Sequence, residues 1–292
     1  MVSSSPQRII SLVPSDTESL FALGLGERVV GRTSYCEEPV DKIAAIPCVG
    51  GTKDVDVDAV CDLTPDMVFA NQEENARGPL EELVARGVPL FVSFPQRVAE
   101  AVSSLARMAR ICSVEREPSV VAVIRRCFKA VSAAQEAIGS RPMVSVFVPI
   151  WLDPLMTISE KTFGSDMLRL AGARNVFADR TRRYPLKADL GLASPLAADR
   201  AAHRDIRYPR ITVDELIERA PAALLLPDEP YAFSAAEGNT MATLGFETIP
   251  QICHLSGKDL FWPGSRIADA LSRLTSSIEA LGQPETKKSE PG

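Results

Sequence analysis

The chain has 292 residues, of which 46% are hydrophobic and 24% are charged. This composition is typical of a soluble globular protein, and the length suffices for two domains of ordinary size. The formal net charge of −6 argues against a nucleic-acid partner, because phosphate binding favours a basic surface. No apolar run approaches the roughly 18 residues of a membrane helix, so we expect a protein that does not span a membrane.

The first residues, Met1 to Pro6, lack the basic region, the apolar region and the cleavage site of a secretory leader. As written, the sequence predicts a cytoplasmic protein, or a periplasmic or extracytoplasmic one if a leader has been removed. None of the six cysteines forms a C-x-x-C pair of the kind that holds zinc or exchanges thiols. Several fall at apolar positions, so we interpret them as buried free thiols in a reducing compartment.

Apolar runs alternate with helical patterns through the first third of the chain. The run Arg8–Val13 predicts a buried strand that ends at Pro14. Ser15 and Glu18 have the spacing of a capping box, which predicts a short helix there. The elements that follow are strand Val29–Thr33, helix Asp58–Leu63, strand Met67–Ala70, helix Pro79–Arg86 and strand Val88–Ser93. This alternation predicts an α/β fold with a parallel sheet and helices on its faces.

The middle of the chain has helical periodicity and no strand pattern. Apolar residues recur at helical spacing from Gln96 to about Ile138, and Pro118 is placed to open a second helix. A helix of about 20 residues spans roughly 30 Å, which is enough to link two domains. The strand pattern returns at Met143–Val148.

The second half of the chain repeats the first. Asp58 and Asp214 each lie seven residues before a proline, Pro65 and Pro221, and an apolar strand follows each proline. We therefore predict two related α/β lobes with parallel sheets joined by a long helix. The predicted boundaries are residues 1–113 for the N-terminal lobe, 114–140 for the linking backbone helix, 141–282 for the C-terminal lobe and 283–292 for a disordered tail.

A polar segment interrupts the second half. Residues Arg183 to Tyr208 include prolines and a glycine, and we expect a long loop, a kind of segment that is often functional. The basic run Arg180 to Arg183 comes directly before it. We interpret this run as solvated surface, with an anion contact as the alternative.

Ligands of open parallel sheets bind beyond the carboxyl ends of the strands, so the loops at those ends, such as Pro149–Pro154, hold the candidate site. These loops carry both tryptophans of the chain, other aromatics and several acids, which suits a large, partly apolar ligand such as a macrocycle. The predicted ligand-binding residues are Ser15, Asp16, Tyr35, Asn71, Glu73, Glu74, Phe94, Trp151, Asp153, Glu229, Tyr231, Asp259, Phe261 and Trp262.

The same residues argue against catalysis. The only histidines are His203 and His254, which leaves a bare metal site short of ligands. No G-x-S-x-G elbow, Walker loop or G-x-G-x-x-G motif occurs. Glu73 and Glu74 are adjacent in a loop and should point apart, so we interpret them as solvated charges or a docking site rather than an acid–base pair. We predict a binding protein, not an enzyme, with no catalytic residue, no metal ligand and no intrinsic cofactor.

An ordered set of motifs runs through nearly the whole chain. Its segments are Arg8 to Glu18, Leu23 to Gly31, Ser34 to Pro39, Val49 to Gly51, Leu63 to Val68, Trp151 to Leu155, Gly164 to Gly172 and Asn175 to Phe177. In this order the set resembles the cobalamin-binding and iron–siderophore-binding proteins of ABC importers, the helical-backbone metal receptor type. The resemblance implies a class III solute-binding protein: two Rossmann-like lobes, a rigid backbone helix, and cobalamin or a related metal chelate in the cleft between the lobes.

The resemblance also implies roles for individual residues. Tyr35 matches an aromatic that lies near the corrin in the cobalamin receptor, and Asp259 to Trp262 is similar to that receptor's ligand-facing loop. Asn71 stands where an aromatic is usual. The positions of the family's two importer-docking glutamates fall near Arg77 and Pro263 in this chain, which are not acidic. The acids available to replace them are Glu73, Glu74 and Glu229.

Three functions are open at this point. The first is a protein that binds a small molecule, cobalamin or another metal chelate, and delivers it to an ABC importer permease or handles it inside the cell. The second is a chelatase-like enzyme on the same scaffold. The third is a cytoplasmic sensor whose acidic loops dock a partner protein.

Overall fold

The computed structural model describes residues 5–140, 142–201 and 203–282, and the predicted disordered tail lies outside them. Its contacts divide the chain into two compact units. Unit 1 comprises the chain up to Ser132 together with Trp262–Ala268, and unit 2 comprises Ala133–Phe261 and the chain from Asp269 onward. The predicted lobe boundaries do not include this return of Trp262–Ala268 to the first unit.

Unit 1 is built on a four-stranded parallel sheet in the order β2-β1-β3-β4. Its strands are β1 (Ile9–Ser11), β2 (Val29–Arg32), β3 (Met67–Asn71) and β4 (Leu90–Ser93). Its helices are α1 (Pro14–Ala22), the 3-10 turn η1 (Gly26–Arg28), α2 (Val40–Ile43), α3 (Val57–Asp62), α4 (Arg77–Ala85) and α5 (Val98–Ile111). The strands and helices that the sequence predicts are present, with ends shifted by at most two residues.

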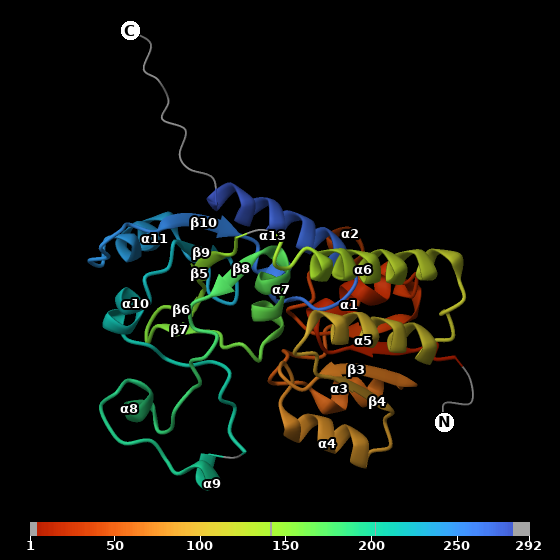
Figure 1. The fold of residues 1–292 in the computed structure, drawn as a ribbon. Helices are drawn as coiled ribbons and strands as arrows, with labels where there is room; N and C mark the ends of the chain where they lie inside the picture. Colours follow the sequence, from red (N-terminus) through yellow and green to blue (C-terminus); the bar gives the residue numbers. More distant parts are fainter. Residues whose placement is uncertain (1–4, 141, 202, 283–292) are drawn as a thin grey trace. The chain divides into compact units, whose positions relative to one another are not determined.

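Successive side chains of this sheet face two helical layers. Ile10 and Val68 belong to a buried cluster with Val60 of α3 and Leu83 of α4. Phe69 follows Val68 in the strand and therefore points to the opposite face, where it is fully buried. Figure 1 shows α5 on the side of this sheet opposite α4, so the core of unit 1 lies on both faces of the sheet.

Unit 2 contains a second four-stranded parallel sheet, in the order β10-β9-β5-β8. Its strands are β5 (Val144–Phe147), β8 (Ala173–Asn175), β9 (Ala223–Pro227) and β10 (Gln251–Leu255), with a separate hairpin of β6 (Pro149–Trp151) and β7 (Met156–Thr157). Its helices are α7 (Phe163–Ala171), α8 (Leu186–Asp189), α9 (Ala198–Ala201), α10 (Val213–Arg219), α11 (Ala235–Ala242) and α12 (Gly257–Phe261).

In chain order, β5, β8, β9 and β10 take the same places in their sheet as β1, β2, β3 and β4. The predicted repeat is therefore confirmed as a shared strand topology. Two longer helices, α6 (Pro118–Glu136) and α13 (Ile267–Leu281), each contain a boundary between the units. Among the described residues, no helix is long and apolar enough to cross a membrane.

The core of unit 2 forms around aromatic side chains. Phe147 of β5 and Phe177 meet edge to face, with ring centroids 5.5 Å apart, and both are fully buried. Leu216 of α10 and Met241 of α11 close the same cluster. Helix α7 ends at Gly172, whose φ of 95° is left-handed backbone that glycine adopts without steric cost, so the chain turns directly into β8.

Helix α1 does not begin as the sequence predicts. It starts at Pro14 after Val13, and no side chain caps it. Proline suits the first helical position because the N–H that it lacks would have no partner there. Ser15 therefore lies inside the helix, and Glu18 pairs with Arg266 at 2.7 and 2.8 Å. The predicted capping box is wrong.

The interpretation of Arg180 to Arg183 as solvated surface is wrong for Arg180. Its side chain is only 4% exposed and pairs with Asp189 at 2.9 Å and Glu215 at 2.7 Å. It also donates to the carbonyl oxygens of Asp189 and Arg210, at 2.7 and 3.1 Å. A guanidinium has five N–H donors, and acceptors from several segments satisfy them here, so its burial is tolerated.

Two segments that we predict as loops contain regular structure. Residues Pro149–Pro154 hold strand β6, whose partner β7 is antiparallel to it. The long polar segment from Arg183 to Tyr208 carries α8 and α9, each four residues long. Both helices are too short to leave a periodic apolar pattern in the sequence, which is why the sequence does not predict them.

Candidate functional site

Strand β6, which follows β5, and the loop after β9 bring three aromatic side chains together in unit 2. The Trp151 and Tyr231 ring centroids are 5.5 Å apart at an interplanar angle of 73°, and those of Tyr231 and Phe233 are 4.6 Å apart. Phe233 is buried in the core of unit 2, whereas Trp151 is 46% exposed. The three rings therefore connect the core to a solvent-facing indole. We call Trp151, Tyr231 and Phe233 the aromatic ladder.

Hydrogen bonds hold the aromatic ladder in place. The Tyr231 hydroxyl donates to Glu237 Oε1 at 2.5 Å, and this hydrogen bond raises the pKa of the phenol. Glu237 belongs to the capping box of α11, and its hydrogen bonds from Ser234 and then from Tyr231 lower the pKa of its carboxyl. Trp151 Nε1 donates to the carbonyl oxygen of Asp153 at 3.1 Å. The exposed indole face is thus presented by a fixed ring.

Of the other predicted site residues of unit 2, one is exposed and three pack against neighbouring residues. Asp153 is exposed beside Trp151. Glu229 packs on Gly257, since a Cβ at that glycine would lie 2.3 Å from Glu229 Cγ. Asp259 is buried and accepts two hydrogen bonds from Arg273 at 2.6 Å.

Phe261 packs on Gly164, where a Cβ would lie 2.9 Å from its ring. Of the predicted residues in this unit, Trp151 and Asp153 are thus exposed, whereas Glu229, Tyr231 and Phe261 are partly exposed.

In unit 1, Asn71 and the loop after β3 are fixed by amide side chains. Asn75 Oδ1 accepts from the Asn71 N–H at 2.9 Å, and Asn75 Nδ2 donates to the carbonyl oxygens of Leu12 and Thr52 at 3.1 and 3.0 Å. Asn71 Oδ1 accepts from the Glu73 N–H at 2.7 Å. These contacts explain why a buried polar residue occupies position 71, where the resemblance leads us to expect an aromatic. Glu74 is exposed in the same loop.

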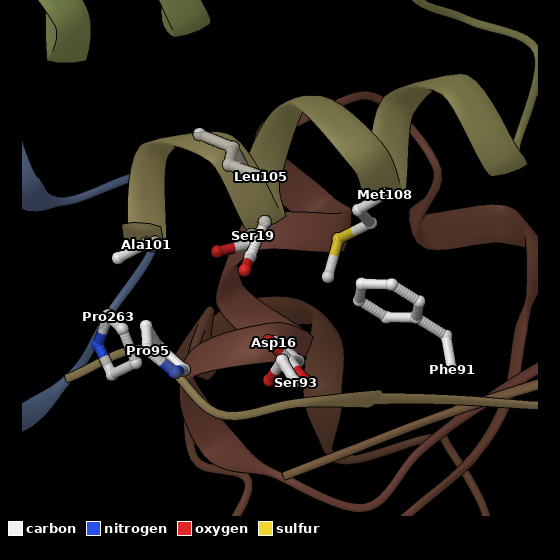
Figure 2. A pocket seen from close by; sticks show the side chains of 11 residues that line it. Asp16, Ser19, Phe91, Ser93, Pro95, Ala101, Leu105, Met108 and Pro263 are labelled. Atoms are coloured by element: carbon white, nitrogen blue, oxygen red, sulfur yellow. The ribbon is translucent and has the colours of Figure 1, made fainter. Parts of the chain in front are cut away.

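Asp16 lies in the first turn of α1, where it lines a pocket of about 10 Å³, room for about one water molecule. Figure 2 shows Ser93 and Pro95 beside it and Leu105 and Met108 on the helix above. Asp16 is 8% exposed, and its Oδ2 atom has no hydrogen-bond partner among the described residues. Burial raises the pKa of this carboxyl from 3.8 to about 7. Ser15, one position earlier, is buried and contributes its carbonyl oxygen to Ser19 at 2.8 Å.

The predicted aromatics of unit 1 differ in exposure. Tyr35 is 60% exposed, and its ring lies over Gly51. Phe94 is partly exposed and lines an open groove of about 440 Å³ between β4 and α5. Trp262 is buried, and the Arg266 guanidinium lies 4.9 Å from its ring centroid. Tyr35 and Phe94 can contact a ligand in this conformation, whereas Trp262 packs within unit 1.

Sequence reasoning missed several residues that shape these surfaces. Phe233, Asn75 and Arg266 were not among the predicted ligand-binding residues, and the roles of Asn75 and Arg266 depend on partners distant in the sequence. Both histidines are exposed, and no cluster of three or more His, Cys, Asp or Glu side chains occurs within the described ranges. Of the cysteines that we interpret as buried free thiols, Cys36, Cys112 and Cys127 are buried, Cys61 and Cys253 are partly exposed and Cys48 is exposed.

Two α/β units with the same strand order have the class III fold of solute-binding proteins, as the sequence predicts. The chain belongs to the periplasmic binding protein family, whose model matches residues 9–229. Family membership agrees with the prediction of a binding protein rather than an enzyme.

Curated relatives match part of the chain. It is 28% identical over 179 residues to the "Vitamin B12-binding protein" of Yersinia pestis (strain Pestoides F). The match covers 61% of this chain and 63% of that relative, so it spans less than two thirds of the relative's length.

Solved structures match over almost the whole chain. The heme-binding protein RhuT from Roseiflexus sp. RS-1, in apo form, has a TM-score of 0.71 at 20% identity, over 95% of this chain and 99% of that one. The vitamin B12-binding protein BtuF of Vibrio cholerae has a TM-score of 0.72 at 17% identity, over 96% and 99% of the two chains. At these identities the likeness establishes the fold.

Proposed function

We propose that this chain binds a flat or macrocyclic metal chelate, cobalamin or a haem-type chelate, and that the aromatic ladder of unit 2 is its main contact there. The observation that carries this proposal is the exposed face of Trp151, held at a fixed angle by Tyr231. The exposed indole presents a flat apolar face, which suits a flat, partly apolar ligand. Asp153 beside it offers a carboxylate to polar groups at the ligand's edge.

The relatives support both ligands. The curated relatives are named for vitamin B12, and the similar solved structures include proteins titled for vitamin B12 and for heme. Iron–siderophore complexes belong to the same chemical class and form the third group to test. We propose no chelatase-like or sensor role, since no contact among the residues that the structure describes favours one.

We further propose that the chain delivers its ligand to an ABC importer permease. This proposal rests on the family assignment. Glu73, Glu74 and Glu229 are the candidate docking acids, and Glu73 to Lys, Glu74 to Lys and Glu229 to Lys substitutions should lower delivery without lowering ligand affinity. The relatives titled as periplasmic favour an extracytoplasmic location, which fractionation of the source cells would decide.

The decisive experiment is a titration of the purified chain with cobalamin, haem and a ferric siderophore, read by calorimetry and visible absorbance. We expect one of them to bind with 1:1 stoichiometry and micromolar or tighter affinity. Binding of none of the three would contradict the chelate proposal.

A matched pair of variants tests the aromatic ladder. Trp151→Ala should weaken binding by about 5- to 30-fold, because truncating a central aromatic contact costs about 1–2 kcal/mol. Ile249→Ala is the control, since Ile249 is an apolar residue of the same unit that is 71% exposed. Tyr35→Ala, measured separately, tests the contribution of unit 1. Equal affinities for Trp151→Ala and Ile249→Ala would show that the ladder is not the contact surface.

A further inference from the structure

The polar segment between β8 and α10 concentrates positive charge in an acidic protein. Residues 180–210 contain seven arginines and one lysine against three aspartates, while the whole chain has a net charge of −6. Eight of the eleven charged side chains in this segment are therefore basic. Its three aspartates determine which guanidinium groups find a carboxylate partner within the segment.

Two of the three aspartates of this segment, Asp189 and Asp205, are already occupied, and the third, Asp199, is exposed. Asp189 is fully buried; its Oδ1 accepts from Arg180 Nη1 and from the Arg183 N–H, both at 2.9 Å, and its Oδ2 accepts from the Arg210 N–H at 2.8 Å. Both carboxylate oxygens of Asp205 accept from the Arg207 guanidinium, at 2.9 and 2.6 Å. Neither acid bonds to the guanidinium group of Arg182 or of Arg210.

Arg182 and Arg210 therefore hold buried donors without acceptors. Among the described residues, Nε of Arg182 and both Nε and Nη1 of Arg210 are inaccessible to solvent and make no hydrogen bond. Leaving a buried charged donor unsatisfied costs more than leaving a neutral one. Burial, and then the nearby positive charge of Arg182, lower the pKa of Arg210. Asp189 accepts from the backbone N–H groups of both Arg183 and Arg210, so Arg182 and Arg210 lie on chain segments that meet at this buried carboxylate.

The surrounding contacts fix these two arginines in place. The Arg182 guanidinium stacks on the Tyr184 ring at 4.5 Å from its centroid, which fixes the plane in which its N–H groups point. The Arg182 N–H donates to the carbonyl oxygen of Ile206 at 2.8 Å. The carbonyl oxygen of Arg210 accepts from buried Arg180 at 3.1 Å. Arg180 and Asp189 therefore act as a rigid base under the pair.

We propose that Arg182 and Arg210 form a binding site for a small oxyanion, a carboxylate or a phosphate group. Such a group has several acceptor oxygens, and guanidinium groups bind it through paired N–H donors. One bound oxyanion would satisfy the orphaned donors of both arginines. This site is independent of the aromatic ladder and of the chelate proposal.

The test is calorimetric titration with inorganic phosphate, sulfate and acetate in a buffer free of other oxyanions. We expect saturable binding of phosphate or acetate with a Kd of about 1 mM or tighter, and a higher melting temperature in its presence. Arg210→Gln and Arg182→Gln should each weaken this binding at least about tenfold. Arg183→Gln is the matched control, because it removes the same charge from an exposed position of the same segment and should leave the affinity within about twofold.

Melting temperatures measured without oxyanions check that the variants fold. Arg210→Gln should melt no lower than the unsubstituted chain, since the substitution removes a buried charge that has no acceptor. A comparison of phosphate with acetate distinguishes the two oxyanions. The affinity of Arg210→Gln for the chelate distinguishes two sources of the oxyanion. This affinity is unchanged if the oxyanion is a free anion, and it falls if the oxyanion is an acidic group of the chelate itself. Absence of saturable binding, or an equal loss in Arg183→Gln, would overturn the proposal.

Discussion

Asp16 should make the stability of unit 1 depend on pH. Burial raises its pKa in the folded chain to about 7, against an ordinary value of 3.8. Between these two values the unfolded chain has lost the proton and the folded chain keeps it. The folded state then binds more protons, so the free energy of unfolding falls as pH rises through this window. Above about pH 7 both states are ionised and the loss is complete.

The size of this effect follows from the pKa difference. The shift from 3.8 to about 7 corresponds to about 4 kcal/mol at 1.36 kcal/mol for each pKa unit, which is an upper bound for this one group. The N-terminal end of α1 favours a carboxylate by about 0.3–1 kcal/mol, so burial is the larger effect. Asp16→Asn replaces the carboxyl with a neutral group of the same shape and should remove this pH dependence.

Denaturant unfolding of the unsubstituted chain and of Asp16→Asn, at about pH 5 and about pH 8, tests this prediction. Asp16→Asn should exceed the unsubstituted chain by up to about 2 kcal/mol at the lower pH and by up to about 4 kcal/mol at the higher pH, so the difference should widen by about 2–3 kcal/mol between them. Asp41→Asn, an exposed first-turn aspartate of α2 in the same unit, is the control and should change neither value by more than about 0.5 kcal/mol. If Asp16→Asn and the unsubstituted chain lose stability in parallel between the two pH values, the buried acid is not the cause.

Two further predictions concern buried polar contacts. Asp189→Asn should lower the free energy of unfolding by about 3–5 kcal/mol, because it leaves the buried Arg180 guanidinium without its counter-charge; a loss below about 1 kcal/mol in urea unfolding would contradict this role. Asn75→Ala should cost about 1–3 kcal/mol and speed hydrogen exchange at Asn71, whose N–H loses its acceptor. Unchanged exchange at Asn71 would show that another contact holds the loop.

The strands and their order of appearance were predictable because they depend on short-range patterns. Runs such as Met67–Ala70 are apolar, short and bounded by turn residues, and a buried parallel strand requires that composition. The repeated aspartate-to-proline spacing before β3 and β9 likewise marks the same helix–strand unit twice. The sequence could also place Trp151 and Tyr231 at one edge of a sheet, because β5 and β9 are neighbouring parallel strands.

The errors share a cause in long-range pairing. Glu18 has the spacing of a capping residue, but its partner is Arg266, which is 248 residues away. Arg180 lies in a basic run, and only the folded chain shows that Asp189 and Glu215 surround it. Neither pairing leaves a periodic pattern, since the partners belong to different elements. Whether a charged residue such as Arg180 is buried or exposed therefore depends on which acids the fold brings to it.

The shared topology of the two units does not give them the same surface. In unit 1 the loop after β3 uses the Asn75 amide to bond backbone groups of other segments, the carbonyl oxygens of Leu12 and Thr52. In unit 2 the equivalent loop, after β9, places Tyr231 against Trp151. The first arrangement uses the polar groups to stabilise the loop, and the second leaves an aromatic face exposed. Because strand order is common to both units, the side chains of these loops must determine which unit contributes more to ligand affinity.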